Sequence, residues 1–267
     1  MAKYKKKRAR ELKHDRFRDT TMLLADRMAD RVAGRGRQVL YGLLGIIVIA
    51  AAGYGIYRWR HKHTEEAEAA IGRAITIARA QISTAPSANP QEPVFSTEQE
   101  RAQRAIEEFQ KVAAKYGDPY RTQAKYFIAR NQLVTDRDKG LAELQSLSSG
   151  TGEVAVLSKF VLAQAKEGDA KYDEAAALYS EIARIGSAVV TPDTANLRLA
   201  AVYEKQGKKK EAADILFNLI SAARNAKDKD GKPIPESAAA REANQKLRSL
   251  DAARHAQLPA APVADIF

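Results

Sequence analysis

Two stretches of the chain align with each other without a gap: LAQAKEGDAKYDEAAALYSEI, residues 162–182, and LAAVYEKQGKKKEAADILFNL, residues 199–219. Each reads as an amphipathic helix, a short polar turn and a second amphipathic helix. Small residues recur where two helices would approach closely, and large apolar residues recur where they would fill the gap to the next pair. The matching positions are Leu162 with Leu199, Ala163 with Ala200, Ala175 with Ala212, Tyr179 with Leu216 and Ile182 with Leu219. The sequence therefore predicts a stack of similar helix pairs.

The spacing of these residues resembles the tetratricopeptide repeat. A Leu-Ala step is followed by a small residue eight positions after the leucine, by alanine at thirteen and by a large apolar residue at seventeen. Three features depart from that pattern: Ala170 stands where Gly207 supplies a turn glycine, Lys166 stands where Tyr203 is expected, and the period is 37 residues instead of 34. The resemblance covers roughly residues 98–223.

Further pairs are expected before these two stretches, and a single capping helix after them. A third unit, with one residue lost, uses Phe127, Ile128, Gly140, Leu144 and Leu147. AIEEFQKVAAKYGDP, from Ala105, resembles the second helix of a first unit that opens with residues 65–82. A stack of pairs also needs a terminal helix with a polar outer face. Residues 237–253 are predicted to supply it, with Ala240, Ala243 and Leu247 facing inward.

The fold predicted for residues 59–255 is therefore all-α, a tetratricopeptide-repeat-like α-solenoid of about four helical pairs with a C-terminal capping helix. Residues 256–267 are predicted to be a flexible tail.

A long apolar run precedes this domain. VLYGLLGIIVIAAAGYGIY, residues 39–57, contains no charged side chain and would span about 28 Å as a helix, close to the bilayer core of about 30 Å. Arginine and lysine flank it on both sides, and Tyr54, Tyr57 and Trp59 cluster at its C-terminal end, as in an interfacial aromatic belt. Residues 38–58 are predicted to form a single transmembrane helix. Two alternatives remain open: a helix buried in a soluble core, and a signal peptide cleaved after the triplet Ala50 to Ala52, which would leave a secreted repeat protein.

The basic charge lies before the apolar run. The chain carries 44 Lys and Arg against 33 Asp and Glu, and most of this excess falls in residues 1–37. The remainder is nearly neutral, so the charge gives no reason to expect specific DNA binding. Such a distribution predicts that the N-terminal tail stays in the cytoplasm and that the repeat domain lies outside. The tail has apolar residues spaced for one amphipathic helix and a charge run suited to anionic lipid or ribosomal RNA, made of Lys5, Lys6, Lys7 and Arg8.

Nothing in the sequence predicts an enzyme. Cysteine is absent, the four histidines are too scattered to form a metal site, and no phosphate-binding loop or nucleophile motif occurs. No catalytic residue, metal or cofactor is expected, although an anchored enzyme with an unrecognised site remains an alternative. A stack of helix pairs instead provides a concave groove for a peptide. In the tetratricopeptide-repeat family the first helix of each pair lines that groove, which implies the candidates Lys125, Gln132, Phe160, Gln164, Glu167, Leu197, Glu204 and Lys205.

The layout as a whole, with a basic tail, one membrane span and the quoted repeats, resembles the YfgM-like family of ancillary SecYEG translocon subunits. Their repeat domain is similar to that of the cell-division coordinator CpoB. This chain is longer at its N-terminus. The resemblance implies a single-pass bacterial inner-membrane protein with a periplasmic domain that contacts translocon subunits, periplasmic chaperones and exported polypeptides. The alternative is a membrane-tethered scaffold for cell-envelope assembly or cell division.

Overall fold

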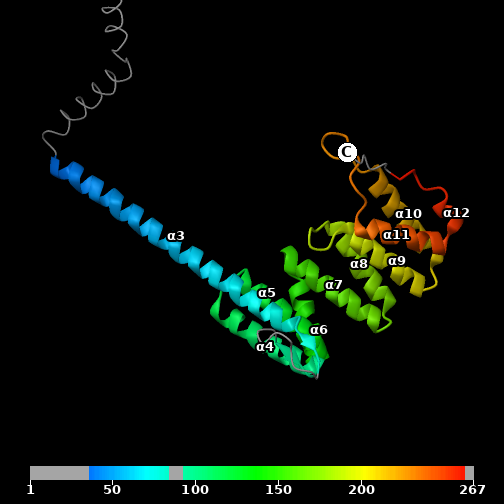
Figure 1. Cartoon of the computed structure of the whole chain (residues 1–267), viewed down its shortest axis with the longest axis horizontal. Helices are drawn as coiled ribbons and strands as arrows, with labels where there is room; N and C mark the ends of the chain where they lie inside the picture. The colour runs from blue at the N-terminus through cyan, green and yellow to red at the C-terminus, as the bar shows by residue number, and fades with distance from the viewer. Residues whose placement is uncertain (1–35, 84–92, 262–267) are drawn as a thin grey trace, which may run out of the picture. The chain divides into compact units, whose positions relative to one another are not determined.

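The computed structural model describes residues 36–83 and 93–261 (Figure 1). The chain divides into two compact units, residues 1–66 and 67–267. The predicted tail helix, the lysine run and residues 262–267 lie outside the described residues. The elements are α3 (Gly36–Ala78), β1 (Gln81–Ile82), β2 (Val94–Phe95), α4 (Glu98–Lys115), α5 (Tyr120–Thr135), α6 (Arg137–Ser148), α7 (Gly152–Gly168), α8 (Tyr172–Ile185), α9 (Pro192–Lys205), α10 (Lys209–Asn225), α11 (Ala238–Leu250) and α12 (Ala252–His255).

The second unit is a succession of helix pairs. From α4 to α12 every helix packs against the next one along the chain, as Figure 1 shows from green to red. The end of α3 with α4 makes the first pair, followed by α5 with α6, α7 with α8, and α9 with α10. Four clusters of buried side chains run through the unit, and each draws on neighbouring helices. The prediction of a mostly helical stack of about four pairs is confirmed.

Residues that match between the two quoted stretches occupy the interior. Each of the ten is at most 7% exposed, and Ala163, Ala175, Ala200 and Ala212 are fully buried. The predicted cap is also confirmed, because Ala240, Ala243 and Leu247 of α11 are buried against α10. Burial of equivalent positions explains why the spacing repeats. At the four alanine positions a larger side chain would push the paired helices apart.

Local sequence sets where the helices begin. Thr97 caps α4 by accepting a hydrogen bond from the Glu100 amide at 3.1 Å, and the Glu100 carboxylate accepts one from the Ser96 amide at 3.1 Å. Asp136, Thr191 and Ser237 cap α6, α9 and α11 in the same way. These side chains satisfy amide groups that a helix leaves unpaired in its first turn. The starts of α4, α6, α9 and α11 are therefore encoded locally.

The turns inside the last two pairs share one geometry. Gly207 has φ +76°, and Ala170, the residue at the equivalent position, has φ +57°. In both turns the next amide donates to a carbonyl five residues back, Lys171 to Lys166 at 2.8 Å and Lys208 to Tyr203 at 2.9 Å. This is the helix-ending motif in which glycine is usual, because a Cβ disfavours positive φ. The alanine noted in the sequence is therefore accommodated with local strain.

We expect Ala170→Gly to raise the free energy of unfolding by about 1 kcal/mol, because glycine removes the strain at φ +57°. The matched change Gly207→Ala introduces the same strain and should lower stability by a similar amount. Urea unfolding followed by circular dichroism measures both values. If both variants shifted the midpoint in the same direction, the shared turn geometry would not explain their stability.

The structure differs from the prediction at the end of the first helix and at the end of the chain. The first helix ends at Ala78, before the predicted end at Ile82, because the chain becomes extended there. Gln81–Ile82 then pairs in parallel with Val94–Phe95, and the Ser83 amide donates to the Phe95 carbonyl at 3.0 Å. The intervening residues 84–92 lie outside the described part.

The end of the chain also differs from the predicted flexible tail as far as residue 261. Leu258 packs against the last buried cluster, and Arg224 of α10 donates a hydrogen bond to the Pro259 carbonyl. A second arginine, Arg254, pairs with Asp214 at 2.5 Å and lies over the Phe217 ring at 5.0 Å.

The N-terminal part of α3 carries large apolar side chains that are exposed. Tyr41, Leu44, Ile46 to Ile49, Tyr54, Ile56 and Tyr57 are each at least 57% exposed. Counted over the described residues alone, no helix of the chain combines the length and the apolarity that crossing a membrane requires.

Candidate protein-binding surface

The eight predicted groove residues fall into three groups. Lys125, Gln164 and Lys205 are exposed, whereas Phe160, Glu167 and Glu204 are half-buried. Gln132 and Leu197 are buried, at 5% and 7% exposure. The structure brings together Phe160, Glu167 and Lys205 around one side chain, Tyr179 of α8. The sequence-based alignment did not predict that contact.

The groove candidate Leu197 is buried and offers no accessible contact. Its side chain joins the cluster formed by Ala200, Leu216 and Ile220 and packs between α9 and α10. A leucine on a helix that is packed on two sides gains more from burial than from facing solvent. Gln132 is equally inaccessible: its Oε1 has no hydrogen-bond partner among the described residues.

Phe160 is the aromatic residue that remains partly accessible on this surface. It packs against the cluster of buried side chains between α7, α8 and α9. Its ring lies edge-on to Tyr179, with centroids 5.7 Å apart and planes inclined at 67°. Edge-to-face contact fixes the orientation of both rings. Phe160 is therefore a rigid, half-exposed apolar residue, the kind of side chain that contributes strongly to protein interfaces.

Glu167, near the end of α7, connects three helices. Its Oε2 accepts a hydrogen bond from the Tyr179 hydroxyl of α8 at 3.1 Å, and its Oε1 pairs with Lys205 of α9 at 2.7 Å. The carboxylate is only 13% exposed, whereas Lys205 is 49% exposed. Charge-assisted hydrogen bonds of this kind are directional and stronger than neutral ones. The contact thus joins the third pair, α7 with α8, to the fourth.

The environment shifts the pKa of both partners of Glu167. Burial raises the pKa of Tyr179 well above its usual value, and the charge and hydrogen bond of Glu167 raise it further, against an opposing effect of Arg198. The hydrogen bond to Glu167 also raises the pKa of Lys205. A raised lysine pKa means that this contribution to stability is complete below the unfolded lysine pKa and is lost as pH rises through the folded one. At neutral pH Lys205 is therefore protonated and the Tyr179 hydroxyl is neutral.

We expect Tyr179→Phe to lower the free energy of unfolding by about 1 kcal/mol, because it removes the hydroxyl that donates to Glu167 and keeps the ring. Equilibrium urea unfolding measures the loss. Tyr203→Phe is the control. Within the described residues, the Tyr203 hydroxyl makes no hydrogen bond from one pair to another. An equal loss in both variants would mean that the Glu167 contact has no specific value.

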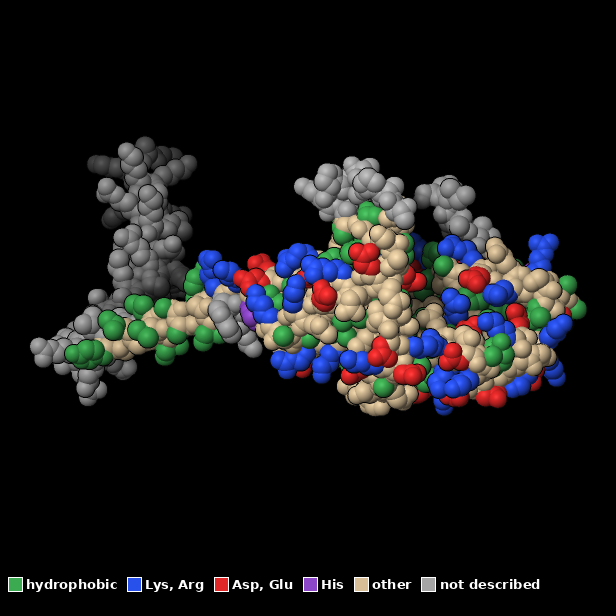
Figure 2. All heavy atoms as spheres, turned by 90° about the horizontal axis from the view of Figure 1, so that it is seen from below, with side chains coloured by type: hydrophobic (Ala, Val, Ile, Leu, Met, Phe, Trp, Pro, Cys, Tyr) green, Lys and Arg blue, Asp and Glu red, His purple; other side chains and the backbone are tan. Residues whose placement is uncertain are grey.

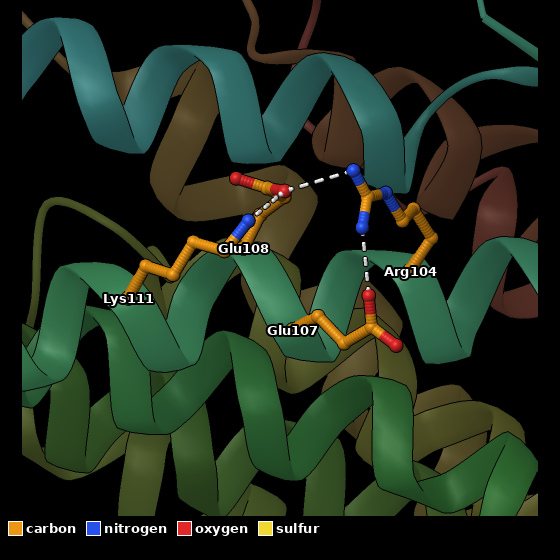
Figure 3. A network of polar contacts seen from close by, with 4 residues as sticks. All are labelled: Arg104, Glu107, Glu108 and Lys111. Carbon is orange, nitrogen blue, oxygen red and sulfur yellow. Dashed lines mark hydrogen bonds and ion pairs between the residues drawn. The ribbon is translucent and has the colours of Figure 1, made fainter.

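A second polar network lies entirely on α4 (Figure 3). Arg104 contacts Glu107 at 2.8 Å and Glu108 at 3.3 Å, and Lys111 contacts Glu108 at 2.7 Å. The hydrogen bond from Lys111 lowers the pKa of Glu108, as do the nearby charges of Lys111, Arg104 and Arg73. Exposed pairs of this type contribute little to stability. They give the first pair a polar outer face.

Charges of both signs are interspersed on the face seen in Figure 2. Within the described ranges, no group of three or more His, Asp and Glu side chains is placed to hold a metal ion. His61 instead pairs with Glu65 on the same helix at 3.1 Å. The network of Phe160, Glu167, Tyr179 and Lys205 joins α7, α8 and α9 through a ring contact, a hydrogen bond and an ion pair.

No family model and no curated protein matches this chain. A distant similarity to solved structures is found. Two crystal structures of a putative kinesin light chain from Podosopora anserina with nearly identical TPR-like repeats, one of them carrying a single substitution, are each 16% identical to this chain with a TM-score of 0.44. Each match covers 59% of this chain and 81% or 80% of the other. The helix pairs described above establish the architecture independently of that distant likeness.

Proposed function

We propose that the protein is a membrane-anchored, tetratricopeptide-repeat-like protein-binding module. In this proposal residues 38–58 span the bacterial inner membrane once, residues 1–37 are cytoplasmic, and the helix pairs lie in the periplasm. The module is an ancillary translocon subunit that helps to pass exported chains to periplasmic chaperones. No catalytic activity is part of the proposal.

The observation that carries the anchor is the distribution of apolar side chains on α3. Ile46, Ile47, Val48 and Ile49 are consecutive, so they point to all sides of the helix, and all four are exposed. A surface-lying helix would need one polar face, and this segment has none. A helix that is apolar all round belongs in lipid or in a large core. The sequence run 39–57, which includes positions whose side chains the structure does not describe, has the length of a bilayer core.

Support for protein binding comes from the helix pairs themselves. Stacked pairs offer one extended surface built from the first helices, and peptide binding to such surfaces needs few specific side chains. Phe160 provides a half-exposed aromatic residue on α7, and Gln164 on α7 and Glu204 on α9 provide polar groups. Lys125 belongs to the same predicted surface on α5. The partner classes of the proposal are translocon subunits, chaperones and unfolded exported chains.

The anchor is tested by replacing Ile47 with lysine. A lysine at the centre of a membrane helix costs about 3 kcal/mol, so we expect the Ile47→Lys variant to lose membrane association on cell fractionation. The matched control is Ile234→Lys, which places the same charge on an exposed isoleucine of the α10–α11 loop and should remain in the membrane fraction. The anchor would be contradicted if Ile47→Lys stayed entirely in the membrane fraction and alkaline carbonate then released it from that fraction.

Topology and partners need separate measurements. Reporters fused after Phe267 and before Lys3 should report an external C-terminus and a cytoplasmic N-terminus; a C-terminal reporter active only in the cytoplasm would refute the orientation. Crosslinking from Phe160 and Gln164, followed by purification in mild detergent, should recover translocon subunits. Recovery of envelope-assembly or division proteins without them would favour the scaffold alternative. N-terminal sequencing of the mature protein tests cleavage after residues 50–52.

A further inference from the structure

The joint between the third and fourth helix pairs is held by directional polar contacts at one end. Lys205 pairs with Glu167, the Gln206 amide donates to Asp173 at 2.9 Å, and Lys208 approaches Asp173 to 3.8 Å. All these contacts join the end of α9 and the following turn to the end of α7 or the start of α8. They cross from one pair to the next, whereas the Lys166–Glu174 ion pair, at 2.5 Å, stays within the third pair.

The remainder of the joint is apolar. Val156, Ala163, Leu199 and Val202 pack there around Tyr179. Apolar contact scales with buried area and changes gradually with displacement, so it constrains the angle between the pairs less sharply than directional contacts do. Ion pairs and hydrogen bonds lose their energy over small displacements, so they do fix it. The angle at this joint therefore depends on the polar contacts at its edge.

Glu167 is the central residue of that edge. Its carboxylate is largely buried and is held by the Tyr179 hydroxyl, whereas Lys205 is half exposed on a flexible stem. The ion pair between a buried acceptor and a mobile cationic partner can break without unfolding either helix. Arg198, the other charge that acts on both Tyr179 and Lys205, lowers the pKa of each and so opposes the effect of Glu167.

We propose that the contact of Glu167 with Tyr179 and Lys205 is a latch that sets the angle between the α7–α8 pair and the α9–α10 pair. When the latch is closed, α9 is held at the end of α7. When it is open, the two pairs pivot about their apolar contact. Phe160 and Gln164 lie on one side of this joint and Glu204 on the other, so the latch sets the width of the candidate binding surface there. The latch itself does not depend on the proposed membrane anchor or on any partner.

Spin-label distances test the latch in the full chain in mild detergent. The chain has no cysteine, so Ala177→Cys on α8 and Asn218→Cys on α10, both exposed, label it at two places only. With the latch closed we expect one narrow distance distribution. Adding Glu167→Gln should broaden it and shift its mean by at least about 1–2 Å, the size of helix shifts at bistable interfaces. Sodium chloride at about 1 M screens charges within about 3 Å. It should therefore broaden and shift the distance distribution of the doubly labelled parent in the same direction.

Glu174→Gln is the matched control, because it removes the same charge at the same edge but from a contact inside one pair. It should leave the distribution unchanged. The latch is refuted if Glu167→Gln retains the parent distribution, or if Glu174→Gln broadens it equally. Should Glu167→Gln lose its helical circular dichroism, Lys205→Gln takes its place, and an unchanged distribution in that variant refutes the latch. Because no partner is present, the result is independent of the proposed function.

Discussion

Gly140→Ala is expected to lower the free energy of unfolding by about 3 kcal/mol, at the upper end of the usual cost of overpacking. Gly140 lies on α6 where that helix meets α5. A Cβ there would be 2.8 Å from the Ala129 carbonyl oxygen and 2.8 Å from the Leu133 nitrogen. Both are backbone atoms of α5, so neither can move aside by changing a rotamer. The second pair would have to separate to admit one methyl group.

The control for this prediction is Gly72→Ala. Gly72 lies inside α3, about two turns before its C-terminal end, and a Cβ there would have nothing within 4 Å. Alanine is favoured over glycine inside a helix by about 1 kcal/mol, so this variant should be more stable than the parent. Urea unfolding of both variants gives changes of opposite sign. A Gly140→Ala variant as stable as the parent would mean that α5 and α6 do not approach as closely as described.

Phe109→Ala is expected to cost about 3–5 kcal/mol, the usual range for removing a buried aromatic ring. Phe109 is fully buried on α4 and stacks on Phe127 of α5, with ring centroids 4.8 Å apart. The same cluster includes Ala67, Ile71 and Ala74 from the end of α3. Each pair of a stacked fold contacts only its neighbours, so the loss should concentrate in the first pairs.

Hydrogen exchange followed by mass spectrometry locates that loss. In Phe109→Ala, amides of α4 and α5 should exchange much faster, while those of α10 and α11 keep their protection. Phe217→Ala provides the mirror control: Phe217 is half-buried on α10 beneath Arg254, so the increase should appear in α10 to α12. Uniform acceleration along the whole chain in either variant would show that the pairs unfold as one cooperative unit.

The repeat spacing predicted most of the interior correctly. Leu162 and Leu199, and the alanines beside them, are buried because each pair repeats the same approach of two helices. The repeat alignment put Gly140 at a position where the two quoted stretches have alanine. In the structure, any side chain at this position would meet the backbone of α5, which explains why it is glycine. Caps such as Thr97 and Ser237 act on amides three residues away, so they too depend on local sequence, although they were not predicted. These features depend on local sequence and on one repeated contact.

The candidate surface was predicted less well. Leu197 and Phe160 occupy equivalent positions in two repeats, yet one is buried and the other half exposed. Periodicity assigns a residue to a face, and the neighbouring helix then determines whether that face is covered. The Glu167 network follows the same rule: Tyr179 is 12 residues from Glu167 in sequence, and Lys205 is 38 residues away. No local pattern links three such positions.

The sequence by itself determined the helix pairs, their caps, the buried alanines and the charge asymmetry that motivates an anchored topology, because these depend on spacing and composition. Only the tertiary structure decided that Ala170 adopts a glycine-like turn, that Leu197 is buried, and that Glu167 joins two pairs through Tyr179 and Lys205. Those outcomes depend on how the third and fourth pairs pack against each other, and packing between pairs is set by side-chain shape across distances that a repeat period does not encode.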